Sequence, residues 1–313
     1  MVPNLTGVGS DEPALQPAIA TVPGWGSVEE VRVSILTAGI TNRNYLLECG
    51  GERVVVRVFG SDTEFLGIDR VAEDVAARAA AQAGVGPPVV AFLPDDGCLI
   101  TRFVDGAPVR VEDLERSDVI AAVARSVRTV HACAPIPSAF PVFRIVEDYA
   151  ALARERGVQP PGAYTEAHEL ALRIEDALGD SPMPLTTCHN DLLNANFLLD
   201  EGHVWILDYE YAGMGDPFFD LGNLSINNGL SPTAQEMLLR AYFGEAHEGH
   251  RARLGLMRLM SDLREAMWGV VQQALSSLDV DYVEYAQRHF DRLLKTAHEG
   301  RVQTWLAQAR QPL

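Results

Sequence analysis

Cysteine is scarce in this chain, and its few thiols lie far apart. The 313 residues include four cysteines, and no two of them form a C-x-x-C pair. This spacing argues against a zinc-binding cysteine cluster and offers no framework of disulfides. Reduced thiols are typical of a cytoplasmic protein, and we expect that location.

The chain also lacks an excess of positive charge and any long apolar run. It has 25 lysine and arginine residues against 43 aspartate and glutamate residues, so its formal net charge is −18. Such a surface repels nucleic acid and favours a small cation, although acidity also simply keeps a protein in solution. No apolar run approaches the roughly 18 residues that a membrane span requires. The first residues show no basic segment followed by an apolar one, so we expect neither membrane insertion nor a signal peptide.

The pattern of apolar residues changes along the sequence, from mainly strand-like to mainly helical. Residues 1–26 are rich in proline and glycine and form an N-terminal extension, with one short helix expected over 14–20. Within 27–104, β-branched and apolar runs separated by turn residues predict an antiparallel sheet, including a hairpin that turns at Asp96-Gly97. Only 64–84 has helical spacing, and it ends at a glycine.

From residue 105 to residue 313 the pattern is mainly helical. Helical periodicity covers 117–133, 165–178, 233–243, 252–278 and 281–297, and 185–211 interrupts it with strand-like runs. The sequence therefore predicts an α+β fold of two lobes. A small β-rich lobe with one main helix is joined to a larger helical lobe, and ligands commonly bind in the cleft between two such lobes.

A dense set of hydrogen-bonding side chains stands beside strand-like residues at 188–200, CHNDLLNANFLLD. A turn after this run would form a hairpin and bring Asp191, Asn196 and Asp208 to one edge. Two carboxylates and an amide oxygen suit Mg²⁺, and a carboxylate left free can take the proton of an attacking hydroxyl. The set indicates phosphoryl transfer from a metal-bound nucleotide. The alternative is that these residues only cap turns.

The same segments resemble the kinase-like phosphotransferases that include choline kinases, ethanolamine kinases and aminoglycoside phosphotransferases. HNDLLNAN is similar to their catalytic motif H-x-D-x-x-x-x-N, and ILDYEYAGMGDPFFDLGN is similar to their metal-binding segment and the acidic helix start after it. The resemblance covers nearly the whole chain and implies a protein-kinase-like fold that uses ATP and Mg²⁺. It implies that Asp191 is the catalytic base or orients the hydroxyl, while Asn196 and Asp208 hold Mg²⁺. His189 and Asp220 would then brace the loop.

The β-rich lobe carries the candidates for nucleotide binding. The loop in LTAGITNRNYLLEC would cover the phosphates with backbone N–H groups and with Gly39, Thr41 and Asn42, and choline kinases have similar loops. Arg57 stands where protein kinases place a phosphate-binding lysine, and choline kinases commonly carry arginine there. A guanidinium keeps that role because it binds phosphate oxygens with two parallel hydrogen bonds. The alternative is an arginine in solvent on an edge strand.

A buried arginine needs an acidic partner. Glu73, on the helix that follows, is our first choice for Arg57, and Glu64 is the second. The connector LITRFVDG would pair its backbone with adenine. The candidates there are Thr101, Phe103 and Val104.

Aromatic and acidic residues in the helical lobe fit a cationic alcohol as the acceptor, because aromatic faces and carboxylates hold ammonium groups. Tyr209, Glu210 and Tyr211 directly follow Asp208 in the sequence. The acceptor-site candidates are Tyr209, Glu210, Asp262, Glu265, Trp268 and Tyr285. Helix packing is the alternative for the aromatic residues, and a solvated helix face is the alternative for the acids on the C-terminal helices.

An ungapped match to choline kinases places Trp268 on the second of two tryptophans found in those enzymes. The first falls on Glu265, and Asn227 falls where those enzymes often have an acid. The set of aromatic and acidic residues around the acceptor's ammonium group is then looser than in choline kinases, or it is built for another amine or alcohol. We expect an ATP-dependent kinase for a small amino alcohol, with choline or ethanolamine first. An aminoglycoside or thiamine is the alternative acceptor, and a non-catalytic binding protein on a kinase fold is the third possibility.

Overall fold

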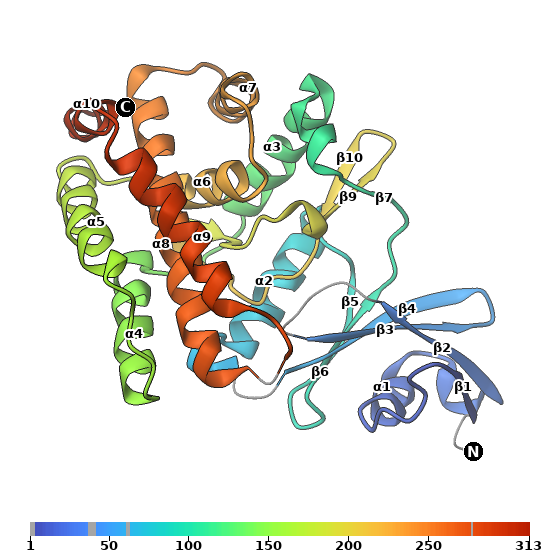
Figure 1. The fold of residues 1–313 in the computed structure, drawn as a ribbon. Helices are drawn as coiled ribbons and strands as arrows, with labels where there is room; N and C mark the ends of the chain where they lie inside the picture. Colours follow the sequence, from blue (N-terminus) through green and yellow to red (C-terminus); the bar gives the residue numbers. More distant parts are fainter. Residues whose placement is uncertain (1–3, 37–41, 61–62, 277) are drawn as a thin grey trace.

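The computed structural model describes residues 4–36, 42–60, 63–276 and 278–313. An antiparallel sheet region precedes a helical region (Figure 1), which confirms the predicted α+β fold. The N-terminal sheet has the strand order β1-β2-β3-β4-β6-β5. Its strands are β1 (Asn4–Gly7), β2 (Glu30–Leu36), β3 (Arg43–Cys49), β4 (Glu52–Val58), β5 (Val89–Leu93) and β6 (Cys98–Arg102).

The sheet forms where β-branched residues alternate between its two faces. In β4, Val54, Val56 and Val58 are buried while their neighbours are partly exposed, as a pleated strand with one core face requires. The hairpin of β5 and β6 turns through Gly97, whose φ is 67°. The prediction of a turn at Asp96-Gly97 is therefore confirmed.

The described part of residues 1–26 packs onto this lobe. The expected short helix is α1 (Leu15–Thr21), and Leu15 and Ile19 are buried in one core cluster with Val31 and Leu47 of the sheet. The strand β1 was not expected, because its four residues show no apolar alternation. It pairs in parallel with β2 and covers that edge of the sheet.

The main helix of the N-terminal lobe, α2 (Arg70–Gln82), begins six residues later than its periodicity indicated. The reason is local. Gly67 has a φ of 79°, and the Asp69 carboxylate then accepts hydrogen bonds from the N–H groups of Val71 at 2.9 Å and Ala72 at 3.1 Å. This N-cap satisfies two donors that have no partner inside the helix and sets where α2 starts.

The second lobe is built around one long helix, α8, which packs against α4, α6, α9 and α10 (Figure 1). The helices of this lobe are α3 (Ser117–His131), α4 (Val142–Glu155), α5 (Ala163–Gly179), α6 (Pro217–Asn227), α7 (Pro232–Phe243), α8 (Glu248–Leu275), α9 (Tyr282–Ala297) and α10 (Arg301–Ala309). The sequence did not predict α4 or α10. Prolines at 135, 137 and 141 obscure the start of α4, and α10 is only nine residues long.

Short strands interrupt the helices and carry the polar segment. The strands β9 (Phe197–Asp200) and β10 (His203–Ile206) form the expected hairpin, which turns through Glu201 and Gly202, both with positive φ. The strand β7 (Ala107–Pro108) pairs with β9, and β8 (Thr186–Cys188) pairs with β11 (Gly213–Gly215). No helix in the described part of the chain is long and apolar enough to cross a bilayer. The four cysteines are free thiols.

Candidate active site

The loop between β8 and β9 is braced by the first turn of α6. The fully buried carboxylate of Asp220 accepts hydrogen bonds from the N–H groups of His189 at 2.8 Å and Asn190 at 2.6 Å. It also lies 2.8 Å from Nε2 of His131. Burial alone would raise the pKa of Asp220, but the hydrogen bond and charge of His131, with further help from His189, hold it below its usual range. The structure thus places Asp220 beneath the loop, where an ionised carboxylate fixes two successive backbone groups.

Asn223 of α6 and Asn228 at its C-terminal end also hold this loop, and the sequence predicted neither contact. Asn223 Oδ1 accepts from the N–H of Leu192 at 2.6 Å. Asn228 Oδ1 accepts from the N–H of Asn194 at 2.7 Å, and its Nδ2 donates to the Leu192 carbonyl at 2.9 Å. The signal was present as four short polar residues in an otherwise apolar helix, since buried polar side chains are expected to satisfy hydrogen-bonding groups such as those of the backbone.

His189 is a neutral side chain whose tautomer follows from its partners. Nε2 lies 2.8 Å from the carbonyl oxygen of Leu207 and therefore donates, while Nδ1 accepts from the N–H of Asp191 at 3.2 Å. Burial lowers the pKa of His189, in spite of the nearby charge of Asp220. The ring ties the loop to the end of the β9–β10 hairpin, which is a bracing position rather than a reacting one.

Asp191, Asn196 and Asp208 are brought together by this arrangement. Asn196 Nδ2 donates to the Asp191 carbonyl at 2.9 Å, and the N–H of Leu207 donates to the Asn196 carbonyl at 2.9 Å. Asp208 follows in the left-handed conformation, with a φ of 67°. Burial strongly raises the pKa of Asp191, the charge of Arg264 opposes that rise, and Asp208 adds to it. Asp191 is half-buried, so its carboxylate sits at the edge of the protein interior.

The partner of Arg57 is Glu73, as predicted. Arg57 Nη1 lies 2.6 Å from Glu73 Oε1 and 2.8 Å from Asp208 Oδ1, while Glu64 is exposed. The Arg57 side chain is only 12% exposed, which rules out the solvent alternative. One guanidinium therefore joins the α2 acid of the first lobe to the carboxylate after β10 in the second.

A second arginine extends this ion network, and the sequence did not reveal it. Arg70 Nη1 lies 2.7 Å from Glu73 Oε2 and 3.3 Å from Glu210 Oε2. Asn42 Nδ2 donates to the same Glu210 oxygen at 2.8 Å. Burial and the charge of Asp208 raise the pKa of Glu210 to about 7, against the opposing charge of Arg57. Glu210 thus lies between the lobes beside Asp208 and not among the aromatic residues.

The remaining nucleotide candidates are only partly described. Gly39 and Thr41 lie outside the described residues. Thr101 pairs with Val55 in the sheet, and the N–H of Phe103 donates to the Arg53 carbonyl at 3.1 Å. Val104 follows Phe103 in the connector, so the connector leaves the sheet directly beside β4. A role in adenine binding stays a prediction for all three connector residues.

Aromatic rings gather around Trp268 on α8. Its Nε1 donates to the hydroxyl of Tyr211 at 3.0 Å, and its ring centroid lies 5.5 Å from that of Tyr285 and 5.9 Å from that of Tyr282. The structure does not bring Tyr209 to this group. The Tyr209 ring packs against His189 instead, with centroids 4.9 Å apart. Tyr211 stands in the place expected for Tyr209.

Glu265 lies in the same group, but both of its oxygens already have partners. Oε1 accepts from Arg264 Nη1 at 2.9 Å and from Asn227 Nδ2 at 3.3 Å, and Oε2 accepts from the Tyr285 hydroxyl at 2.8 Å. Burial would raise the pKa of Glu265, yet the charge of Arg264 outweighs this and holds it below the usual range. Arg264 is buried and stacks on Tyr211, with 4.3 Å between its Cζ and the ring centroid. The acceptor region therefore contains a fixed ion pair.

Asp262 does not join these residues, although it is one helical turn before Glu265. Its Oδ1 lies 2.9 Å from His289 Nδ1 and 2.5 Å from Arg292 Nη2. Both partners are on α9, and Asp262 also lines a separate cavity. The phase of α8 turns this acid away from Trp268.

The geometry so far places Asp191, Asn196 and Asp208 beside an ion network between the lobes, and comparison with known proteins shows the family of the chain. The pattern of the phosphotransferase enzyme family matches residues 32–256. This is more than half of the chain, which therefore belongs to the phosphotransferase enzyme family.

Individual proteins show which members of this family are similar to the chain. A choline/ethanolamine kinase family protein from Mesorhizobium loti has 32% sequence identity and a TM-score of 0.81, with 94% of this chain and 97% of that chain covered. Probable ethanolamine kinase A of Dictyostelium discoideum is 26% identical, with 86% of this chain and 86% of that protein covered. The aminoglycoside phosphotransferase APH(4)-Ia is similar in fold, with 17% identity, a TM-score of 0.62, and 85% and 94% coverage.

Proposed function

We propose that this protein is an ATP-dependent kinase that transfers the γ-phosphoryl group to the hydroxyl of a small amino alcohol. The observation that carries this proposal is the half-buried Asp191, whose backbone carbonyl accepts a hydrogen bond from Asn196 and whose carboxyl pKa responds to the charges of Arg264, Glu265 and Asp208. In this proposal residues 27–104 bind the nucleotide, and residues 105–313 carry the catalytic and acceptor sites. The protein works in the cytoplasm.

The residues proposed to hold Mg²⁺ fit such an ion. Asn196 directs its Nδ2 to a backbone carbonyl, which leaves Oδ1 as a possible ligand. Asp208 Oδ1 is buried and has no hydrogen-bond partner among the described residues, although Arg57 lies near it. An oxygen-only donor set is what Mg²⁺ prefers. When bound there, Mg²⁺ supplies positive charge that offsets the charge of the phosphate oxygens.

The chain's own residues then position the reactants. Asp191 accepts the hydrogen bond of the acceptor hydroxyl, aligns it for in-line attack, and takes its proton. The new O–P bond forms as the bond between the γ-phosphorus and the β–γ bridging oxygen breaks and ADP leaves. Its pKa is raised by burial, which makes it a better base than an exposed aspartate. Arg57 binds the non-transferred phosphates, and Asn42 stands at the end of the loop proposed to cover them. Most of the rate acceleration in such a site comes from positioning and charge compensation.

For the acceptor, the polar groups favour a primary amine. Asn227 donates its Nδ2 to Glu265, and its Oδ1 is buried without a hydrogen-bond partner in the described part of the chain. A primary ammonium carries N–H donors for Asn227 and Glu265, whereas a quaternary ammonium has none. We therefore place ethanolamine first and choline second. The relatives named as ethanolamine kinases support this order.

The direct test is a coupled assay of ADP formation with ethanolamine, choline, thiamine, homoserine and kanamycin. We expect the highest kcat/KM with ethanolamine. Asp191→Ala should lower kcat by about 10²- to 10⁴-fold while the circular dichroism spectrum stays native. Near-normal turnover of this variant would refute the base assignment, and a clear preference for kanamycin would refute the amino alcohol.

Trp268→Ala tests the acceptor site separately. We expect the KM for the amine to rise by about tenfold, because loss of an aromatic face weakens cation binding by 1–2 kcal/mol at a desolvated site. The KM for ATP should stay within about twofold. Trp205→Ala, on the β9–β10 hairpin, is the matched control and should change neither constant. An unchanged amine KM in Trp268→Ala would remove this ring from the pocket.

A further inference from the structure

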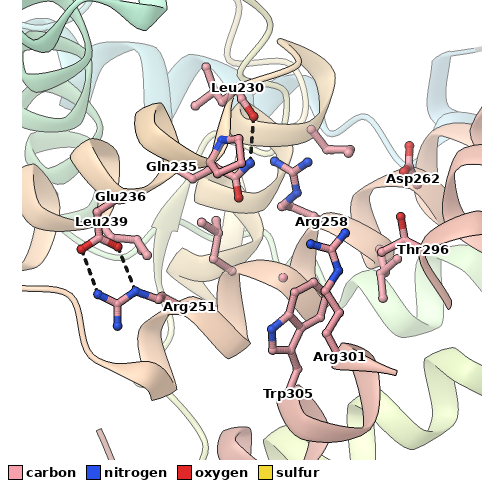
Figure 2. A pocket seen from close by; sticks show the side chains of 15 residues that line it. Leu230, Gln235, Glu236, Leu239, Arg251, Arg258, Asp262, Thr296, Arg301 and Trp305 are labelled. Atoms are coloured by element: carbon pink, nitrogen blue, oxygen red, sulfur yellow. Dashed lines mark hydrogen bonds and ion pairs between the residues drawn. The ribbon is translucent and has the colours of Figure 1, made fainter. Parts of the chain in front are cut away.

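A second cavity lies on the helical lobe, between the end of α6 and helices α7, α8 and α10 (Figure 2). It encloses about 500 Å³, which is within the range of small-molecule sites. Three arginines line it: Arg251 and Arg258 from α8, and Arg301 from α10. In a chain with a net charge of −18, such a concentration of cations requires an explanation.

The acids that line this cavity are already paired. Glu236 binds Arg251 through both oxygens, at 2.8 and 2.9 Å, and also accepts from Arg240 Nε at 2.9 Å. Asp262 is held by Arg292 and His289 of α9. Neither carboxylate is therefore free to neutralise a further arginine.

Arg301 pairs with Glu299 at 2.5 Å, so Arg258 is the arginine of the cavity that has no carboxylate partner among the described residues. It is half-buried, its Nη1 donates to the hydroxyl of Ser225, and no acid lies within ion-pair distance of it among the described residues. Burial lowers its pKa to about 10, and Arg292 and Arg301 push in the same direction against the charge of Asp262. Removing a guanidinium from water next to other cations is unfavourable unless an anion joins them. Figure 2 shows the guanidinium groups of Arg258 and Arg301 side by side in the cavity.

The cavity also has an apolar wall. The Trp305 ring lies against Gly255 of α8, where an added Cβ would come within 2.8 Å of the ring. Leu230, Leu254 and Leu259 also line the cavity, and Arg301 lies over the Trp305 ring with 5.0 Å between its Cζ and the ring centroid. A cationic end and an apolar wall together suit a ligand with an anionic head and an organic body.

We propose that this cavity binds a phosphate monoester, with the phosphate between Arg258 and Arg301 and the organic part against Trp305. Guanidinium groups bind phosphate oxygens in bidentate geometry, and a dianion offsets more of the local positive charge than a carboxylate does. The ligand is either the phosphorylated product of this enzyme or an unrelated monoester, since both share the group that the arginines recognise.

Contacts lead from this cavity to the acceptor site. Asp262 in the cavity wall binds His289, whose ring centroid lies 4.7 Å from that of Tyr285. Tyr285 in turn donates to Glu265. A ligand that draws Arg258 toward itself changes the charge around Asp262, and this chain of contacts carries the change to the acceptor. Occupancy is therefore expected to alter the KM for the acceptor more than the KM for ATP.

The test is calorimetric titration of the full-length protein, without nucleotide, with phenyl phosphate, O-phosphoethanolamine and inorganic phosphate. We expect phenyl phosphate to bind at low salt. Arg258→Gln and Arg301→Gln should each weaken it by at least about tenfold, because each removes charge-assisted hydrogen bonds. Arg116→Gln, an exposed arginine paired with Asp118, is the matched control and should bind as the wild type does.

The three probes distinguish the sources of the ligand. Tighter binding of O-phosphoethanolamine than of phenyl phosphate, lost in Arg301→Gln, identifies the reaction product as the ligand; the reverse order identifies an unrelated monoester. Arg301 is exposed, so its variant remains informative even if Arg258→Gln fails to fold. Binding unaffected by both substitutions, or no binding of any probe at millimolar concentration, overturns the site. Binding without any change in the acceptor KM overturns the coupling.

Discussion

The catalytic loop and the lobe interface meet at Asp208, but they are held by different kinds of interaction. The loop is fixed by side chains of α6 that bind its backbone, with Asp220 as the only charged group among them. The interface is held by ion pairs of Arg57 and Arg70 with Glu73, Asp208 and Glu210. Buried hydrogen bonds thus hold the loop in place, whereas the ion pairs of the interface leave its residues able to exchange partners when the proposed ligands bind.

The exchange follows from what the interface residues are proposed to bind. Arg57 and Asp208 contact each other at 2.8 Å, yet the first is proposed to meet phosphate and the second Mg²⁺. When the nucleotide enters, each finds an opposite charge there, and their mutual contact is no longer needed. The buried hydrogen bonds of the loop have no such alternative, because an unpaired N–H inside the protein costs about 1–3 kcal/mol.

The largest effect is expected from breaking the brace. Asp220→Ala leaves the N–H groups of His189 and Asn190 and the ring of His131 without their acceptor. We expect the free energy of unfolding to fall by about 3–5 kcal/mol, measured by urea denaturation. The matched control is Asp118→Ala, which removes an exposed acid from the first turn of α3 and should cost less than about 0.5 kcal/mol. Equal effects of the two substitutions would show that the loop is not braced by this carboxylate.

A smaller and different effect is expected at the interface. Arg57→Lys keeps the charge but loses the planar group that spans Glu73 and Asp208. We expect the KM for ATP to rise by about tenfold, with a change in the free energy of unfolding below about 1 kcal/mol. Arg78→Lys, on α2 and paired with Asp74 at the surface of the same lobe, should leave the KM for ATP unchanged. A large loss of stability in Arg57→Lys would mean that the interface is as rigid as the loop.

A third effect depends on pH and concerns Glu210. Its pKa is raised from an ordinary value of 4.5 to about 7 in the folded protein, so the folded chain binds a proton more readily than the unfolded chain between these values. The contribution of Glu210 to stability is therefore full below pH 4.5 and is lost as the pH rises through 7. Without nucleotide or Mg²⁺, the wild type should lose stability relative to Glu210→Gln across this range, by up to about 3 kcal/mol. A difference that stays constant from pH 5 to pH 8 would contradict the raised pKa.

The sequence predicted those features that depend on order along the chain. The spacing from Asp191 to Asn196 and Asp208 across one hairpin was sufficient to bring them together. Glu73 could be predicted as the partner of Arg57 because it lies on α2, the main helix that follows the Arg57 strand. Features that depend on side-chain direction were not predicted. The left-handed turn at Asp208 decides that Tyr211 and not Tyr209 meets Trp268, and the phase of α8 decides that Glu265 and not Asp262 does.

The brace shows a further limit. Asn223 and Asn228 act on backbone groups of a loop about 30 residues earlier in the chain, and their role appears only when the two segments pack together. Arg70 likewise joins Glu73 to Glu210 across the two lobes. Such pairs carry no local pattern, since periodicity reports which residues share a face and not what that face meets.

The backbone conformation of Asp208 is energetically unfavourable for a residue with a side chain. In the left-handed backbone conformation, a residue with a side chain has a conformational free energy roughly 1–2 kcal/mol higher than glycine. Aspartate is among the few residues that tolerate this conformation. Glycine would relax the chain at this position but would supply no oxygen. If Asp208 holds Mg²⁺ as proposed, a screen for heat-resistant variants would favour replacing it with glycine and would lose the proposed ligand.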